Sequence, residues 1–172
     1  MSTLRVDTIL GESGKERRGL MTYAIICDQK TQDTDGGTFS SGAWQTRDLN
    51  HTIADPDNIV TIPASEDGFI LQAGSYFIEV IAPSFGTNAN VARLYNVTAD
   101  SVTEYGSQSY SRSASGDLGE SKSFVYARVT ITGATTFRVE HRCSTSRTTN
   151  GFGVGHNFGP EKYTVVKIFK EA

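Results

Sequence analysis

Three short runs near the end of the chain decide its fold class. They read SKSFVYARVTI at Ser121–Ile131, TTFRVEHRC at Thr135–Cys143 and YTVVKIF at Tyr163–Phe169, and all are rich in β-branched and aromatic residues. Gly133 separates the first two runs, and a glycine-rich segment precedes the third. Such runs between turn residues predict strands, and a chain that closes on several of them predicts an antiparallel β domain.

Similar runs upstream predict a complete strand set of eight to ten members. The upstream strands are expected at Leu20–Asp28, Ile59–Ile62, Phe69–Leu71 continuing across a turn at Gly74 into Tyr76–Ala82, Val91–Val97 and Val102–Tyr105, with Ala43–Arg47 and His51–Ala54 as short edge strands. Pro83 should end the strand before it, because proline cannot donate to a ladder. We expect Ser107–Gly119 to form an exposed hairpin or loop. No segment has a 3.6-residue apolar period, so helix content should be minimal.

Composition bounds the class of protein. At 172 residues the chain is the size of one β-sandwich domain with an extra segment. Its hydrophobic share of 37% argues against disorder, and its formal charge of −3 gives no basic field for nucleic acid. No apolar stretch approaches the ~18 residues of a membrane span, so we expect no membrane insertion. The start, MSTLRVDTIL, lacks the features of a signal peptide, which predicts synthesis in a cytoplasm.

The first residues are expected to form an arm. Ser2–Leu10 alternates apolar and polar residues, and the charged segment GESGKERRG at Gly11–Gly19 is typical of a linker. The chain therefore divides into an arm and linker at 1–19 and a head domain at 20–172. The apolar residues of the arm are too few to fold alone and should pack on another chain, which makes them candidates for docking: Leu4, Val6, Ile9 and Leu10. An unstructured tail is the alternative.

Large apolar residues fall on both faces of several expected strands. In Phe124–Ile131, Val125 and its alternate neighbours form a core face, but the opposite face holds Phe124 and Tyr126. Phe77 takes the same position in Tyr76–Ala82. A sheet face that meets water should be polar. We therefore expect Phe77, Phe124 and Tyr126 to be buried between subunits. A thick loop that covers one sheet is the alternative.

The sequence shows no catalytic motif, and we expect neither a cofactor nor a metal. His141 and Cys143 share one face of a strand, but the remaining ligands of a zinc site are missing, so a buried, hydrogen-bonded His141 is expected. Cys27 and Cys143 are the two cysteines, and we expect both to be buried free thiols, with a disulfide between neighbouring strands as the alternative. The loop aspartates are typical of solvated turn residues rather than a calcium site.

Two segments rich in Tyr, Ser, Arg and Asn are candidates for recognition. They are QSYSRSAS at Gln108–Ser115 and RCSTSRTTNGFG at Arg142–Gly153. Tyrosine offers a rigid amphipathic contact, while Ser and Asn adapt their hydrogen bonds to a glycan or a protein. The residues expected to take part are Tyr105, Tyr110, Arg112, Arg147 and Asn150. Solubilising turn residues are the alternative.

The order of these segments along the chain resembles that of a known family of globular head domains. The runs YAIICDQ, AWQTRDLN, FILQAGSYFIEVIAPSF and VARLYNV, followed by the three terminal strands, resemble the jelly-roll head of complement-type and tumour-necrosis-factor-like domains. The opening STLRVDTI is similar to the start of many bacteriophage tail-fibre chains. The resemblance implies a homotrimer around a threefold axis, with aromatic side chains toward that axis.

These observations predict an all-β antiparallel jelly-roll sandwich with a short extended N-terminal arm. The expected function is that of a non-enzymatic phage virion protein, a short tail fibre or receptor-binding head for host attachment. Its partners would be two further copies, other virion proteins through the arm, and a host surface glycan or protein. A capsid decoration protein that stabilises the shell and a free bacterial glycan-binding lectin are the alternatives.

Overall fold

The computed structural model describes residues 22–114 and 116–171, and within them it contains strands and no helix. The predicted arm residues Leu4, Val6, Ile9 and Leu10 lie outside the described residues. The strands are β1 (Thr22–Lys30), β2 (Gln45–Thr46), β3 (His51–Ala54), β4 (Val60–Thr61), β5 (Phe69–Leu71), β6 (Gly74–Phe85), β7 (Asn88–Asn96), β8 (Ser101–Tyr105), β9 (Ser109–Ser111), β10 (Ser113–Ala114), β11 (Asp117–Leu118), β12 (Glu120–Ile131), β13 (Thr135–Cys143) and β14 (Glu161–Lys170).

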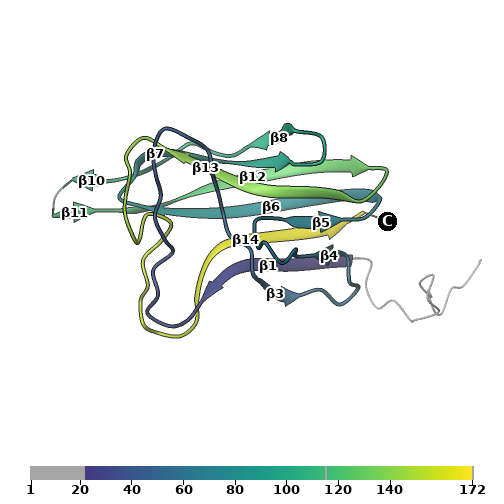
Figure 1. Cartoon of the computed structure of the whole chain (residues 1–172), viewed down its shortest axis with the longest axis horizontal. Coiled ribbons are helices and arrows are strands. Elements are labelled where there is room, and N and C mark those ends of the chain that lie inside the picture. Colours follow the sequence, from purple (N-terminus) through teal and green to yellow (C-terminus); the bar gives the residue numbers. More distant parts are fainter. Residues whose placement is uncertain (1–21, 115, 172) are drawn as a thin grey trace, which may run out of the picture.

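Two antiparallel sheets form a sandwich (Figure 1). The first sheet has five strands in the order β12-β6-β14-β1-β3. The second sheet has seven strands, with β4-β5-β13-β7-β8 as its path, β2 beside β13 and β9 beside β7. Strands β10 and β11 form a separate hairpin, as predicted for this stretch. The all-β antiparallel sandwich predicted from the sequence is confirmed.

Alternation of side chains fixes the register of the first sheet. Strands β6 and β12 pair without interruption from Glu120 opposite Phe85 to Ile131 opposite Gly74. Buried and partly exposed residues alternate along both strands, so that Val80 and Val125 face inward while their neighbours face outward. A slip of one residue would turn every core side chain toward solvent, so the apolar pattern specifies this pairing.

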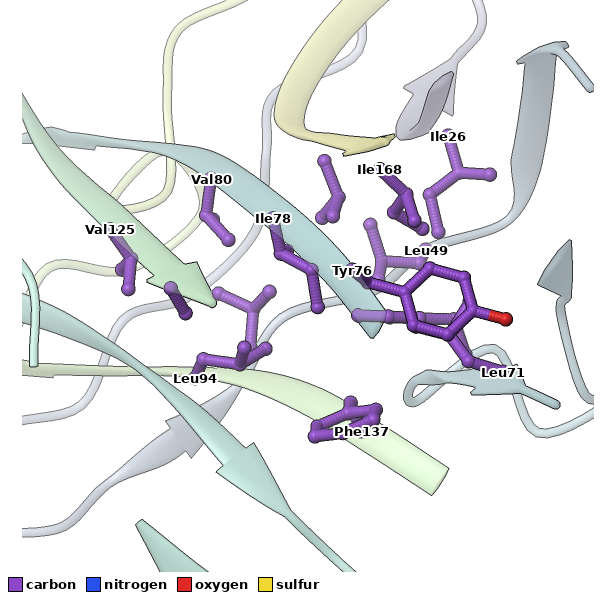
Figure 2. Packing of buried hydrophobic residues seen from close by; sticks show 14 of the residues in the cluster. Ile26, Leu49, Leu71, Tyr76, Ile78, Val80, Leu94, Val125, Phe137 and Ile168 are labelled. Carbon is purple, nitrogen blue, oxygen red and sulfur yellow. The ribbon is translucent and has the colours of Figure 1, made fainter. Parts of the chain in front are cut away.

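The core lies between the two sheets (Figure 2). Val125, Ile78 and Ile168 come from the first sheet, and Leu94 and Phe137 from the second. Tyr76 is also fully buried, and its hydroxyl donates to the carbonyl of Gln72 at 2.9 Å. Burial of these side chains removes apolar surface from water, which is the main favourable term in folding.

The predicted end of a strand at Pro83 is wrong, because β6 continues through it to Phe85. The pairing between β14 and β6 ends at Val165 opposite Ile81, so β6 is already an edge on that side when it reaches Pro83. A proline is tolerated there because no amide donor is required. The Pro83 carbonyl instead accepts a hydrogen bond from Arg47 Nη1 at 3.1 Å.

Two long loops meet at one end of the sandwich, on the left in Figure 1: residues 31–44, between β1 and β2, and residues 144–160, between β13 and β14. Phe39 and Arg147 exchange backbone hydrogen bonds of 2.9 Å. The buried Arg47 holds this end together, because its Nε donates to Thr164 Oγ1 at 2.7 Å and its Nη2 to the Phe152 carbonyl at 3.2 Å. Desolvation lowers the pKa of Arg47 to about 9.

Candidate functional surfaces

The outer face of the first sheet is unusually apolar. Phe124 lies opposite Ile81, and Phe77 lies opposite Phe169 in the neighbouring strand. The rings of Phe77 and Phe169 stack with centroids 6.4 Å apart. We call this surface the apolar face; it consists of Tyr23, Ile25, Phe77, Ile81, Phe124, Tyr126, Val165 and Phe169. These side chains are partly exposed, and Tyr126 reaches 57% exposure.

Charged residues within the apolar face occur in pairs. Lys167 lies beside Glu79 with Nζ and Oε2 3.3 Å apart, in the middle of the face. At its end, Arg128 makes a two-point contact with Glu171, at 2.6 and 2.8 Å. Paired charges lower the cost of covering such a face, because neither partner is left alone when water is removed.

A loop covers one end of the first sheet. Gly153 lies against the ring of Tyr163, and the Tyr163 hydroxyl donates to the Thr34 carbonyl at 2.5 Å. Burial raises the pKa of this hydroxyl above its usual range. Among the described residues this loop covers only one end of the sheet and leaves the rest of its outer face partly exposed. A hollow of about 250 Å³ lies between this loop and the apolar face, beside Ile81 and Val165.

The outer face of the second sheet has a different character, because arginine and aromatic side chains alternate on it. The Arg93 guanidinium carbon lies 4.0 Å from the centre of the Trp44 ring, and the ring centroids of Trp44 and Tyr105 are 6.0 Å apart. Arg93 and Arg138 also flank Tyr95, at 5.0 and 4.9 Å. We call Trp44, Arg93, Tyr95, Tyr105 and Arg138 the arginine–aromatic strip. Cation–π contacts of this kind hold flat side chains in fixed orientations.

A buried carboxylate supports this strip. Glu140 is 3% exposed, and its two oxygens accept from different arginines. Arg93 Nη2 lies 2.6 Å from Oε2, and Arg138 Nη2 lies 2.6 Å from Oε1. The carboxylate of Glu140 therefore bridges two guanidinium groups, and Asp100 adds a second carboxylate beside the Tyr95 hydroxyl.

The predicted recognition residues do not form one site. Tyr105 joins the strip at 55% exposure, and Tyr110 is 64% exposed on β9. Arg112 pairs with Asp117 in the β10–β11 hairpin. Arg147 donates from Nε to Asn150 Oδ1 at 2.9 Å and lies over the Phe85 ring, so these two residues mainly contact each other.

The predicted interface residues, in contrast, share one surface. Phe77, Phe124 and Tyr126 all lie on the apolar face. Sequence reasoning missed Trp44 and Arg93, which are far apart in the chain and meet only through the pairing of β2 and β7 with β13. It also missed Phe158, which is 96% exposed on the 144–160 loop.

The histidine and the two thiols of the interior are buried, and burial shifts their pKa values against the charged form. His141 is fully buried, as predicted, and its Nε2 lies 3.1 Å from Asn90 Oδ1. Burial, aided by repulsion from Arg47, holds the pKa of His141 well below its usual value. Cys27 and Cys143 are buried free thiols, which confirms the prediction. Burial raises the pKa of Cys143 to about 11, so the nucleophilic thiolate is disfavoured.

Residues 22–114 and 116–171 hold no cluster of three or more His, Cys, Asp or Glu side chains that could bind a metal ion. These residues also form no helix with the length and apolarity needed to cross a membrane.

Solved structures with the same fold identify the architecture. The globular domain of zebrafish complement 1qA protein matches with a TM-score of 0.52 at 12% identity, over 87% of this chain and 96% of that one. Eiger TNF from S. frugiperda matches with a TM-score of 0.56 at 14% identity, over 90% and 94%. Murine APRIL matches with a TM-score of 0.53 at 7% identity, over 87% and 98%.

The sequence itself has no such match, since no protein-family model and no curated protein sequence matches it. The structural likeness therefore rests on the arrangement of strands. The chain has the jelly-roll sandwich fold of complement-type and tumour-necrosis-factor-like globular domains, as its strand order predicted.

Proposed function

We propose that this chain is a non-enzymatic binding head that forms a homotrimer through its apolar face. In this proposal it is a virion protein of a bacteriophage, a short fibre or receptor-binding head, and the arm at 1–19 docks on the particle. The observation that supports assembly most strongly is the apolar face, which holds eight large side chains on one side of a single sheet.

Exposure of so much apolar surface to water is unfavourable, which is why such a face is expected to bind a partner. Soluble monomers rarely expose a contiguous apolar patch of more than a few hundred square ångströms. A closed ring of three copies covers the same patch on every copy and leaves no free edge. The outward-pointing Phe77, Phe124 and Tyr126 are then buried, as the sequence predicted, and the Glu79–Lys167 pair enters the interface already neutralised.

The state of the titratable groups supports a role in binding rather than catalysis. Glu140 is held by two arginines, His141 is kept neutral in the core, and both thiols are buried. A general base or nucleophile needs access to a substrate and a pKa near the working pH. All four groups are shielded from a substrate, and burial holds the pKa of His141 well below its usual value and the pKa values of both thiols above theirs.

The virion role rests on the sequence of the arm. STLRVDTI resembles the start of tail-fibre chains, and its apolar residues need a partner chain. The experiment removes Met1–Gly14 and supplies the truncated chain in trans while the phage that encodes it infects its host. We expect a folded, trimeric protein that is absent from purified particles.

A linker variant with Glu12→Ser and Lys15→Ser is the matched control, because it keeps every apolar residue of the arm and should be incorporated. Normal occupancy by the truncated chain would show that the head itself docks, which contradicts the role of the arm and favours a capsid decoration protein. Gold-labelled full-length chain on the tail supports a fibre, whereas label over the whole capsid contradicts it.

A further inference from the structure

A second hollow lies on the outer face of the second sheet, away from the apolar face. It measures about 480 Å³, within the ~300–1,000 Å³ range of small-ligand sites. The residues that line it and bear on its chemistry are Ser41, Ala89, Val91, Gln108, Arg142 and Ser144, and we call them the polar hollow. Because it lies on the opposite side of the sandwich, assembly through the apolar face leaves it open.

Arg142 is the charged group of the polar hollow. It is exposed on β13, opposite Val91 of β7. Its Nη2 makes one long contact of 3.5 Å with the Gly42 carbonyl. Among the described residues it has no acidic partner, whereas Arg93, Arg112, Arg128 and Arg138 each pair with a carboxylate. No carboxylate lines the hollow either, so an anionic ligand meets an unpaired guanidinium and no opposing charge.

The other lining groups favour a hydroxyl-rich ligand. The Gln108 side chain makes no hydrogen bond with the described residues, and Ser144 Oγ has only a long contact of 3.5 Å to the Thr87 carbonyl. Ala89 and Val91 give a small apolar floor. Tyr110 does not line the hollow itself, but it pairs with Ala89 across β9 and β7 and is 64% exposed, so its side chain is on the same face of the sheet as Ala89.

The frame around these groups is fixed by hydrogen bonds. Ser41 is held by the Ser146 hydroxyl at 2.9 Å, and the Ser144 amide donates to the Ala89 carbonyl at 2.9 Å. Binding therefore requires little ordering of the backbone, which lowers its entropic cost.

We propose that the polar hollow binds a carboxylate-bearing saccharide, with the carboxylate on Arg142 and the C–H face of the sugar on Ala89, Val91 and Tyr110. A guanidinium fork matches a carboxylate in two-point geometry, while amide and hydroxyl groups adapt to sugar hydroxyls. The inference rests on the proposed function, since it names the receptor chemistry that such a head would recognise.

The test is a titration of ¹⁵N-labelled full-length chain, followed by NMR, with a disaccharide that contains one uronate residue. The same disaccharide with the carboxylate reduced to an alcohol is the comparison ligand. We expect saturable shifts at the amides of Val91 and Ser144, and a Kd at least about tenfold lower for the uronate form, because charge-assisted hydrogen bonds are the stronger ones.

The variant Arg142→Gln should lose this preference, and Arg142→Lys should recover only part of it, because lysine keeps the charge without the fork. Arg17→Gln is the matched control, because it removes one positive charge from the linker at 11–19, and it should bind like the wild type. Arg142 is exposed, so its variants should keep the unfolding midpoint of the parent chain.

Equal affinity for the acidic and neutral disaccharides would overturn the inference, as would shifts confined to another surface or no saturation at millimolar ligand. The oligomeric state and uronate binding, measured separately, distinguish failure of the proposed function from failure of this inference. A monomeric chain that binds uronate keeps the site and loses the trimeric head, whereas a trimer that ignores uronate loses the site alone.

Discussion

Protonation of His141 should make the head sensitive to acid. Its folded pKa lies well below the usual 6.5, because the buried ring cannot be hydrated as a cation and Arg47 repels the charge. Between the folded pKa and about 6.5 the unfolded chain binds a proton that the folded chain lacks, so stability falls as the pH falls. Below pH 6.5 the slope approaches ~1.4 kcal/mol of unfolding free energy per pH unit, the value for one proton bound on unfolding.

The assay is urea unfolding at a series of pH values and one fixed protein concentration, read by the fluorescence of the single tryptophan, Trp44. His141→Gln keeps a polar side chain opposite Asn90 and removes the titrating group, so the slope below pH 6.5 should decrease by the stated amount. His156→Gln, at an exposed histidine, is the control and should keep the wild-type slope. Identical slopes for His141→Gln and the wild type would refute the reasoning.

Three further substitutions test the packing of the head, each by its unfolding midpoint. Glu140→Gln should lower stability by about 2–3 kcal/mol, because Arg93 and Arg138 lose the buried negative charge and one of its two acceptor oxygens. Glu171→Gln, in the exposed pair with Arg128, should leave the midpoint nearly unchanged. Arg47→Met should cost about 3 kcal/mol or more, because Thr164, Pro83 and Phe152 lose a donor; a loss below 1 kcal/mol would contradict this. Gly153→Ala should destabilise by about 1–3 kcal/mol, since a Cβ would lie 2.3 Å from the Tyr163 ring, whereas Gly133→Ala meets no atom within 4 Å and should be neutral.

The strands and their inward faces could be predicted from the sequence, because apolar side chains along a strand recur with a period of two. Val125 and Phe124 are neighbours in the chain, and alternation alone placed one in the core and the other outside. The order of these runs also indicated the jelly-roll sandwich, which the solved structures confirm.

Features that depend on contacts between segments far apart in the chain could not be predicted from the sequence. Arg47 was expected in an edge strand, yet it is fully buried because three acceptors from other segments converge on it. Pro83 was expected to end a strand, since the sequence does not show on which side β6 loses its neighbour. The Trp44–Arg93 contact and the polar hollow require the register of β13 with both β2 and β7.

The mass of the chain in solution tests assembly through the apolar face most directly. Tyr126 on this face and Tyr105 on the second sheet are exposed to 57% and 55%, so they form a matched pair. By light scattering at micromolar concentration, we expect the wild type and Tyr105→Glu to have three times the 18.6 kDa mass of one chain. Tyr126→Glu should dissociate into monomers, because it buries a charge without a partner. A monomeric wild type, or a Tyr126→Glu variant as trimeric as Tyr105→Glu, would contradict assembly through this face.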